Sequence, residues 1–530
     1  MTISSVDLIV VALYALVLLG VALFVSRTPD GEEKSVNDYF LAGQSLPWWA
    51  IGASLIAANI SAEQIIGMSG QGYVVGLAIA AYEWQAALVL LIVARLFLPI
   101  FLKRGIYTMP QFLQQRFGSG VKTLMSVYWI VLYVAINLTT VLWLGALAIN
   151  TLTGVSVFVA MAGLAVFAVA YSTYGGLKAV ALTDIIQVTV LVIGGLAIAW
   201  LTLGMIGGDA GVSGGLARVY SEVPEKFVMI LERDHPNYGD LPGIWTLLGG
   251  LWVLHFSYWG FNQYIIQRAL GAKSLGEAQT GLAFAAFLKL LMPLIIVLPG
   301  IAAYVLAQPD FAQLDASALD AESDRTYPAL MGIMPSGLRG LIFAALLAAI
   351  VSSLASMMNS ISTIFTLDVY RAVRGDESQQ HYVFVGRATA VVSIVLALFL
   401  AQPLLGSLAS AFQVLQEYTG FVAPGVVAVF LTGMFWRRTT HAGALAMLIT
   451  SVAANIACKF MLADLAFIIR IWLVFLLCLV IGAVVSTATP EPEEGQAVDL
   501  NDVQFSSGFG FNAMALLIVA ILIGLYAVFW

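Results

Sequence analysis

Four polar side chains lie within one apolar stretch of the chain. Residues 57–67 read Ala-Ala-Asn-Ile-Ser-Ala-Glu-Gln-Ile-Ile-Gly, which places Asn59, Ser61, Glu63 and Gln64 inside a segment long enough to cross a membrane. Polar groups are costly in hydrocarbon and usually face a cavity or another helix. The pattern therefore predicts a solute-binding site at membrane depth, with a polar seam between two helices as the alternative.

A second polar interruption occurs near the middle of the chain. Residues 254–263 read Leu-His-Phe-Ser-Tyr-Trp-Gly-Phe-Asn-Gln within another apolar run, and Lys289 lies deep inside the next run. A lysine far from both membrane surfaces cannot extend its ammonium to water, so we expect Lys289 to face the protein interior. Arg95 can reach the surface from the cytoplasmic end of its run, whereas Arg470 can reach its own surface or pair internally.

The composition places these groups in a membrane protein. Of 530 residues, 61% are hydrophobic and 10% are charged, and the mean hydropathy is +0.95. Soluble proteins carry about 25% charged residues. The net charge of -7 comes from acidic stretches such as 310–324 and 491–502, which we interpret as aqueous loops. Cys458 and Cys478 both lie in apolar runs, which indicates packing roles and argues against a disulfide or zinc site.

Apolar runs long enough to cross a bilayer, about 20 residues each, recur along the chain. The first run lacks a basic leader and a small-residue cleavage pattern, so we interpret it as a membrane span. We expect an all-α polytopic protein with about fourteen transmembrane helices. The predicted spans are 6–27, 47–71, 77–101, 123–152, 157–176, 178–205, 243–268, 279–307, 335–370, 384–402, 409–434, 442–461, 466–486 and 509–529.

The two interrupted runs occupy matching places in this series. If 6–27 is a lead helix, then 47–205 and 243–434 each hold five spans and each begins with an interrupted run. Because five is odd, the two sets must cross the membrane in opposite orientations. Inverted repeats of this kind bind substrate and coupling ion where their broken helices meet, near the midplane. With three additional helices at 442–530, we expect one membrane transport domain spanning 1–530.

The distribution of basic residues predicts the orientation, because cytoplasmic loops retain Lys and Arg. Three of the 23 basic residues lie within spans, and fourteen others fall in one set of alternate loops, which we place inside. Because the number of spans is even, we expect both termini on the extracytoplasmic side of the plasma membrane. The opposite set of loops holds only Arg218, Lys226, Arg233, Arg325, Arg339 and Lys459.

Six motifs, in order and nearly from end to end, resemble the sodium:solute symporter family. Within that family they are similar to the bacterial sodium/galactose branch of the sodium/glucose cotransporters. The motifs are Asp38-Tyr39-Phe40-Leu41-Ala42-Gly43, the stretch 57–67, Tyr82-Glu83-Trp84, Tyr174-Gly175-Gly176-Leu177, Tyr258-Trp259-Gly260 and Val351-Ser352-Ser353. The resemblance implies a LeuT-like core of two inverted five-helix repeats. It also implies sodium-driven symport of a hexose, of the galactose or glucose type, into the cell by alternating access.

The resemblance also implies the side chains that would contact sugar hydroxyls. Amides donate and accept hydrogen bonds, a carboxylate accepts them and an ammonium donates them. For Glu83 and Lys289 a buried ion pair that orients helices is the compatible alternative. For Gln416 the alternative is a helix-packing hydrogen bond, because Gln413 and Glu417 are close competitors. The implied contacts are Asn59, Gln64, Tyr82, Glu83, Lys289 and Gln416.

Tyr258 and Trp259 correspond to a gate beneath the sugar in the family pattern. Membrane aromatic residues commonly form belts at the interfaces, but these two stand beside a glycine within a span. Two residues depart from the galactose-transporting relatives, since Ala86 replaces a serine and His255 replaces an asparagine. These changes put the preferred hexose in doubt, because epimers are discriminated by single hydrogen bonds. Gln85 is a candidate to compensate for Ala86, although adjacent helical residues face different ways.

For sodium, the resemblance implies a shell of backbone and hydroxyl oxygens. Broken-helix transporters use unwound carbonyls for this purpose. The implied ligands are the carbonyls of Ala57, Ile60 and Ala349 with the hydroxyls of Ser352 and Ser353.

Four further residues have expected roles near these sites. Asp184 would lie on the sodium exit path, or it would cap a helix N-terminus. Tyr133 and Asn137, four apart on one helix face, are candidates to support the inner gate. We expect Glu63 to bind backbone amides that the helix break frees.

Other functions are weighed against symport. Gly211-Val212-Ser213-Gly214-Gly215 fits a nucleophile elbow, but it follows no predicted strand, and no metal-protease or phosphate-loop motif occurs in the sequence. The residues do not repeat as rings or carbonyl filters, as those of a channel do. A family member for inositol, sialic acid or an amino acid is the nearer alternative to a hexose carrier.

Overall fold

The computed structural model describes residues 3–25, 45–106, 108–172, 177–375, 377–406, 410–492 and 496–530. Within these ranges, the side chains at 18–19, 22–25, 171–172, 177–184 and 379 are not described. The motifs at 38–43 and 174–176 therefore lie outside the described residues. Throughout the described part the regular elements are helices, and one isolated bridge pairs Leu46 with Ala272.

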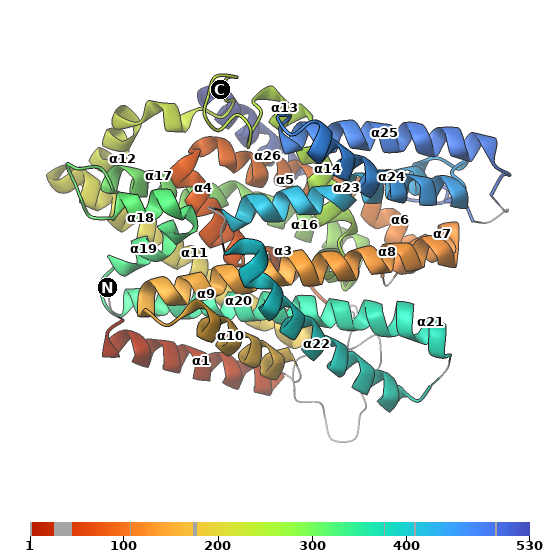
Figure 1. Ribbon diagram of the computed structural model, residues 1–530, viewed down its shortest axis with the longest axis horizontal. Coiled ribbons are helices and arrows are strands. Elements are labelled where there is room, and N and C mark those ends of the chain that lie inside the picture. The colour runs from red at the N-terminus through yellow and green to blue at the C-terminus, as the bar shows by residue number, and fades with distance from the viewer. Residues whose placement is uncertain are drawn as a thin grey trace.

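Long helices run side by side along the longest axis of the molecule (Figure 1). Among described residues, ten helices are long and apolar enough to cross a membrane, or eleven if the bent pair α3 (Trp48–Asn59) and α4 is one span. The all-helical class is confirmed. The count of fourteen stays a prediction; of α1 (Ser5–Val25) and α10 (Val157–Ser172), the parts with described side chains, Ser5–Val17 and Val157–Ala170, are apolar but shorter than a full span.

The first interrupted run is a broken helix. Helix α3 is followed by a π-helical turn, Glu63–Gly67, and by α4 (Met68–Val74), with a 64° bend between the two halves. The backbone departs from helical geometry at Ile60, whose ψ is 86°, and the Ser61 amide donates to the Asn59 carbonyl at 2.9 Å. Ser61 also donates through its hydroxyl to the Glu63 carboxylate. Such local side-chain hydrogen bonds compete with the helix ladder and stabilise the break.

The second interrupted run is broken as well. Helices α13 (Ile244–Leu248) and α14 (Leu251–His255) lead into a π-helical turn, Phe256–Gly260. Asn262 is extended, with φ −81° and ψ 123°, and α15 (Gln263–Leu270) starts after it. Both interruptions predicted from the sequence are therefore real breaks.

Each broken helix packs against the helix that follows the other one. Helix α3 contacts α16 (Leu275–Ile295), and α14 contacts α5 (Ala81–Ile92). The third and fourth helices of the two sets also exchange contacts, since α9 packs on α22 and α10 packs on α20. Repeats related by a pseudo-twofold axis produce this reciprocity. Their limits, 47–205 and 243–434, stay a prediction, as do the lead helix 6–27 and the three helices in 442–530.

Glycines allow α3 and α16 to approach closely. A Cβ on Gly52 would lie 2.7 Å from the carbonyl oxygen of Gly281, and one on Gly281 would lie 2.9 Å from that of Trp48. Membrane helices associate through such small residues. This contact brings Lys289 of α16 beside the end of α3.

The remaining helices complete the bundle. At the end where the chain begins, α12, α18 and α19 gather, and α7 and α21 lie at the opposite end (Figure 1). The bounds are α6 (Leu98–Lys103), α7 (Met109–Phe117), α8 (Ser119–Leu132), α9 (Thr139–Thr153), α11 (Leu177–Gly207), α12 (Gly211–Glu222), α17 (Val297–Leu306), α18 (Ala316–Ala321), α19 (Thr326–Gly332), α20 (Leu338–Thr363), α21 (Arg371–Arg374), α22 (Gln379–Leu405), α23 (Ala411–Phe435), α24 (His441–Met461), α25 (Phe467–Ala488) and α26 (Phe509–Val528). π-Helical turns also occur at Val93–Phe97, Tyr133–Leu138 and Ile364–Tyr370.

Candidate functional site

A cavity lies where the two broken helices meet. The space between them, open solvent included, is ≈ 760 Å³. The breaks, α5, α16, α23 and the α8–α9 region all contribute to its wall. All nine residues that the sequence analysis assigned to the solute line it: Asn59, Gln64, Tyr82, Glu83, His255, Tyr258, Trp259, Lys289 and Gln416.

A buried ion pair stands in the wall of this cavity. The Lys289 ammonium donates to Glu83 Oε2 at 2.7 Å and also to Asn59 Oδ1, and it lies 4.9 Å from the centroid of the Trp259 ring. The expectation that Lys289 faces the interior is confirmed, since the residue is 1% exposed. An ammonium has three donors. Among the described residues, these two acceptors use two of them, which leaves the third donor of Lys289 at the cavity wall.

Four buried polar atoms around the cavity have no hydrogen-bond partner among the described residues. They are Gln64 Oε1, Tyr82 Oη, His255 Nε2 and Asn137 Oδ1, and all four residues line the cavity. Buried polar groups in proteins nearly always have partners. The cavity wall therefore has several polar atoms available to the hydrogen-bonding groups of a guest or of water.

Tyr258 connects the two breaks. Its hydroxyl accepts hydrogen bonds from Asn59 Nδ2 at 3.2 Å and from the Tyr264 hydroxyl at 2.9 Å. Its ring meets the Trp259 ring edge-on, with centroids 5.1 Å apart. Asn59, which also accepts from Lys289, thus bridges the aromatic pair and the charged centre.

Tyr133 contacts the second break, and Asn137 lies at the cavity. The Tyr133 hydroxyl donates to Asn262 Oδ1 at 2.7 Å, where the chain is extended before α15. Asn137 lines the cavity itself. Both residues lie in a π-helical turn, which widens the helix locally. Their role in supporting the inner gate stays a prediction.

Gln416 is distinguished from its two neighbours by their partners. Gln413 donates to Gln71 Oε1 at 2.9 Å, and Glu417 pairs with Arg470 at 2.8 Å and with Lys459 at 3.3 Å. Only Gln416 of the three lines the cavity. The internal pairing of Arg470 is thereby settled, and Arg95, the other arginine weighed, contacts the Ser507 hydroxyl.

Gln85 does not compensate for Ala86. Its amide donates to the Leu247 carbonyl at 3.0 Å, on α13, and it does not line the cavity. Adjacent helical residues face different ways, and this physical reason overturns the suggestion. The other departure, His255, does line the cavity and meets the Tyr82 ring edge-on at 6.2 Å.

The five residues expected around sodium lie on α3, at its end, and on α20. Helix α20 packs against α3, and Ala57, Ile60, Ala349, Ser352 and Ser353 are all buried. Within the described part of the chain, the Ser353 hydroxyl has no partner. The Ser61 amide would bond the Ala57 carbonyl in a continuous helix, but it turns to Asn59 instead. These oxygens suit a hard cation such as sodium.

Two expected residues are placed less completely. Asp184 belongs to α11, but its side chain lies outside the described residues. Glu63 was expected to bind amides at the break; its carboxylate accepts from the Ser61 hydroxyl within the break and lines the cavity.

Several residues of the cavity wall were not singled out from the sequence. Ser257 and Thr419 are small hydroxyl residues, which in membrane helices usually bond their own backbone, and Asn262 offered a signal only through its place in the second interruption. The apolar members carry no signal at all, because they resemble any packed residue. The set comprises Trp129, Leu132, Leu254, Ser257, Asn262, Leu415 and Thr419.

Solved structures share this architecture. A Na+-coupled sialic acid symporter in a substrate-bound outward-open state aligns with a TM-score of 0.79 at 21% identity, covering 93% of this chain and 99% of that one. A nucleobase-cation-symport-1 family transporter aligns with a TM-score of 0.55 at 15% identity, covering 89% and 98%. At these identities the likeness establishes the LeuT-like fold.

Sequence relatives establish the family. A sodium/glucose cotransporter of Vibrio parahaemolyticus is 48% identical, over 99% of this chain and 98% of its own. Sodium/glucose cotransporter 4 and sodium/myo-inositol cotransporter 2 of Mus musculus are 35% and 34% identical, over 83% and 84% of this chain and 66% and 68% of theirs. The model of the sodium:solute symporter family matches residues 39–451. The chain therefore belongs to the sodium:solute symporter family, and it is a membrane transporter and not an enzyme.

Proposed function

We propose that this protein carries a hexose into the cell together with sodium, by alternating access. The observation that carries the proposal is the set of unpartnered polar atoms on Gln64, Tyr82, His255 and Asn137 around the Lys289–Glu83 pair. A pyranose offers hydroxyl groups around its rim and an apolar face. The hydroxyl groups match these polar atoms, and the apolar face matches the aromatic rings of Tyr258 and Trp259.

The charge of the cavity supports a neutral solute. Its acidic and lysine lining residues are Glu63, Glu83 and Lys289, with His255 as the one histidine among the described lining residues, and Lys289 is already paired with Glu83. A solute carboxylate would meet no unpaired cation among the described lining residues and would approach Glu63. A sugar or polyol is therefore favoured over sialic acid or an amino acid, in agreement with the names of the relatives.

Sodium and sugar would meet at one broken helix. We assign sodium to the oxygens of Ala57, Ile60, Ala349, Ser352 and Ser353, and sugar to the cavity on the other side of the same break. Asn59 lies between Ala57 and Ile60 in the chain and touches both Lys289 and Tyr258. Ordering of the break by sodium would thus set the sugar contacts, which is a direct route for coupling.

The gate and the orientation complete the proposal. Tyr258 would close the cavity toward the cytoplasm, held by Asn59 and Tyr264, and Asp184 would lie on the sodium exit path. Both termini would lie outside. Two contacts support this placement. Near the N-terminus, the Ser4 hydroxyl hydrogen-bonds the Ser336 hydroxyl, and near the C-terminus, the Phe529 carbonyl accepts a hydrogen bond from the Met229 amide. The distribution of basic residues places the loops that hold Ser336 and Met229 outside.

The proposal is tested in proteoliposomes that hold the purified protein. Uptake of labelled galactose and of labelled glucose is measured under an inward sodium gradient and with choline replacing sodium. We expect uptake only with sodium, and we expect unlabelled hexoses to compete with one another. Uptake that is unchanged in choline would refute coupling.

A competition panel separates the substrate classes. It contains galactose, glucose, myo-inositol, sialic acid and a neutral amino acid, each against the labelled hexose and each also tested as its own labelled substrate. Inositol transported in preference to every hexose would move the assignment to polyols, and sialic acid or amino acid transport would contradict the charge argument.

A further inference from the structure

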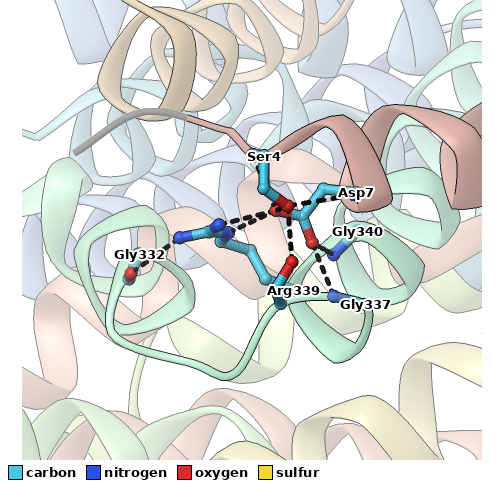
Figure 2. A network of polar contacts seen from close by, with 7 residues as sticks. Ser4, Asp7, Gly332, Gly337, Arg339 and Gly340 are labelled. Carbon is cyan, nitrogen blue, oxygen red and sulfur yellow. Dashed lines mark hydrogen bonds and ion pairs between the residues drawn. The ribbon is translucent and has the colours of Figure 1, made fainter.

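A buried polar cluster joins the first turn of α1 to the start of α20, away from the cavity (Figure 2). Asp7, 0% exposed, is at its centre. Its Oδ1 accepts hydrogen bonds from the backbone amides of Gly337 at 2.8 Å and Gly340 at 3.0 Å. Its Oδ2 accepts from Arg339 Nε at 2.9 Å and Nη2 at 2.6 Å.

Asp7 therefore caps a helix other than its own. Helix α20 begins after Gly337, which has a φ of +88° and no side chain with which to cap. The first amides of a helix have no partner within the helix, and a carboxylate at this place satisfies them and complements the helix dipole. The Asp7 carboxylate on α1 therefore provides the hydrogen-bond acceptor for the first amides of α20, which Gly337 cannot provide because it has no side chain.

The cluster is fixed from several directions. The Ser4 amide and hydroxyl both donate to Asp7 Oδ2, at 3.0 and 2.8 Å. Arg339 extends from Asp7 to the Gly332 carbonyl at 3.2 Å, at the end of α19. A Cβ on Gly340 would lie 2.6 Å from Asp7 Cα, so the two helices touch backbone to backbone here.

Helix α20 carries the residues proposed to bind sodium. Ser353 is thirteen residues beyond Gly340, or about 20 Å along a helix that rises 1.5 Å per residue. No bend is required between them, because α20 runs unbroken from Leu338 to Thr363. A shift or rotation at the capped end is therefore transmitted to Ala349, Ser352 and Ser353.

We propose that Asp7 is a positioning residue for the sodium site: by capping α20 from the neighbouring helix α1, it sets the axial position of the helix that carries Ser352 and Ser353. The lead helix is then part of the ion-coupling machinery. The inference rests on the proposed function, since it takes the α20 oxygens as sodium ligands.

The test compares Asp7→Ala, which removes the oxygens that cap α20, with Asp7→Glu and with the surface control Glu222→Gln, which removes the carboxylate of the exposed Arg218–Glu222 pair. For Asp7→Ala we expect the sodium concentration at half-maximal hexose uptake to rise by about threefold to tenfold, which corresponds to about 0.7–1.4 kcal/mol of sodium binding. The hexose KM at saturating sodium is expected to stay unchanged. Asp7→Glu should restore part of the sodium affinity, and Glu222→Gln should match wild type.

A merely structural role would give a different result. The variant would then lower the melting temperature or the maximal uptake rate while the half-saturating sodium concentration stayed at the wild-type value, and this would overturn the proposal. If Asp7→Ala gives too little folded protein, Arg339→Lys, which keeps the charge but loses the paired donors, is measured in the same way. If the proposed sodium-coupled transport is itself wrong, the wild-type protein will show uptake that does not depend on sodium. That result is distinct from a failure of the Asp7 proposal.

Discussion

The ammonium of Lys289 lies 2.7 Å from the carboxylate of Glu83, and their side chains are 1% and 2% exposed. Two charges so fully removed from water stabilise the protein only if their geometry is good and their other hydrogen bonds are satisfied. Asn59 accepts from the same ammonium. The pair therefore has a structural role as well as a place in the cavity wall, and variants can separate the two.

Removing one partner should be more harmful to folding than removing both. Lys289→Met or Glu83→Gln alone leaves a buried charge without its partner, which costs about 3–5 kcal/mol of stability. The double variant Lys289→Met/Glu83→Gln should regain much of the lost melting temperature, measured in detergent, because no unpaired charge is left. Hexose uptake should be lost in all three variants, because the solute loses its donor and acceptor.

The double variant also decides between the two roles. If it recovers uptake along with stability, the pair only orients α5 and α16 and does not contact the sugar. Glu222→Gln, in an exposed ion pair whose contribution is about 0–1 kcal/mol, is the control for a lost carboxylate.

Ser353→Ala should weaken sodium dependence and leave sugar preference intact. The Ser353 hydroxyl is buried, and among described residues it has no protein partner, so its removal breaks no hydrogen bond of the fold. Loss of one oxygen ligand should raise the half-saturating sodium concentration about tenfold, which corresponds to about 1.4 kcal/mol. The ranking of hexoses in the competition panel should not change.

The matched control for this change is Ser360→Ala, a buried serine on the same helix outside the proposed ligand set. It should leave sodium affinity near the wild-type value. A Ser353→Ala protein with normal sodium affinity but an altered hexose ranking would remove Ser353 from the ion site.

The sequence predicts the cavity well because hydrocarbon penalises polar groups. Asn59, Gln64 and Lys289 have no low-energy place in a membrane helix except a lined interior, so composition and position alone point to them. His255 and Tyr258 follow because they interrupt an apolar run. Their roles needed the family resemblance as well, since a polar residue at membrane depth does not identify its guest.

Other features could not be read from the chain. Ser257 and Thr419 look like residues that bond their own backbone. Asp7, near the start of the first run, looks like a solvated acid at a helix end, and its partner Arg339 is 332 positions away. The π-helical turns, such as Tyr133–Leu138, also have no local signature, because packing and not propensity selects them.

Asp324 is expected to make the stability of the protein sensitive to pH. It lies outside the membrane-spanning segments, between α18 and α19, and its Oδ2 accepts from the Ala411 amide, at the first residue of α23, at 2.7 Å. Burial raises the pKa of Asp324 from 3.8 to about 7, opposed in part by hydrogen bonds from Ala411 and Ser410. The nearby charged groups are Glu322, which raises this pKa further, and Arg325, which pairs with Glu322 at 2.6 Å.

The sign of the effect follows from the raised pKa. The folded protein holds the proton more tightly than the unfolded chain, so this stability is fully present below about pH 4 and is lost as the pH rises through about 7. Between those values Asp324 contributes a slope of at most about 1.4 kcal/mol per pH unit. Asp324→Asn, which cannot ionise, should remove this slope.

Thermal unfolding of both proteins from pH 5 to pH 8 tests the prediction. We expect the wild-type melting temperature to fall relative to that of Asp324→Asn as the pH rises, with the difference levelling off above about pH 7. Glu322→Gln is the companion variant: it removes the neighbouring negative charge, so the pKa of Asp324 should fall and the decline in melting temperature should level off at a lower pH than in wild type. A difference between wild type and Asp324→Asn that stays constant across the range would show that Asp324 does not change its protonation there.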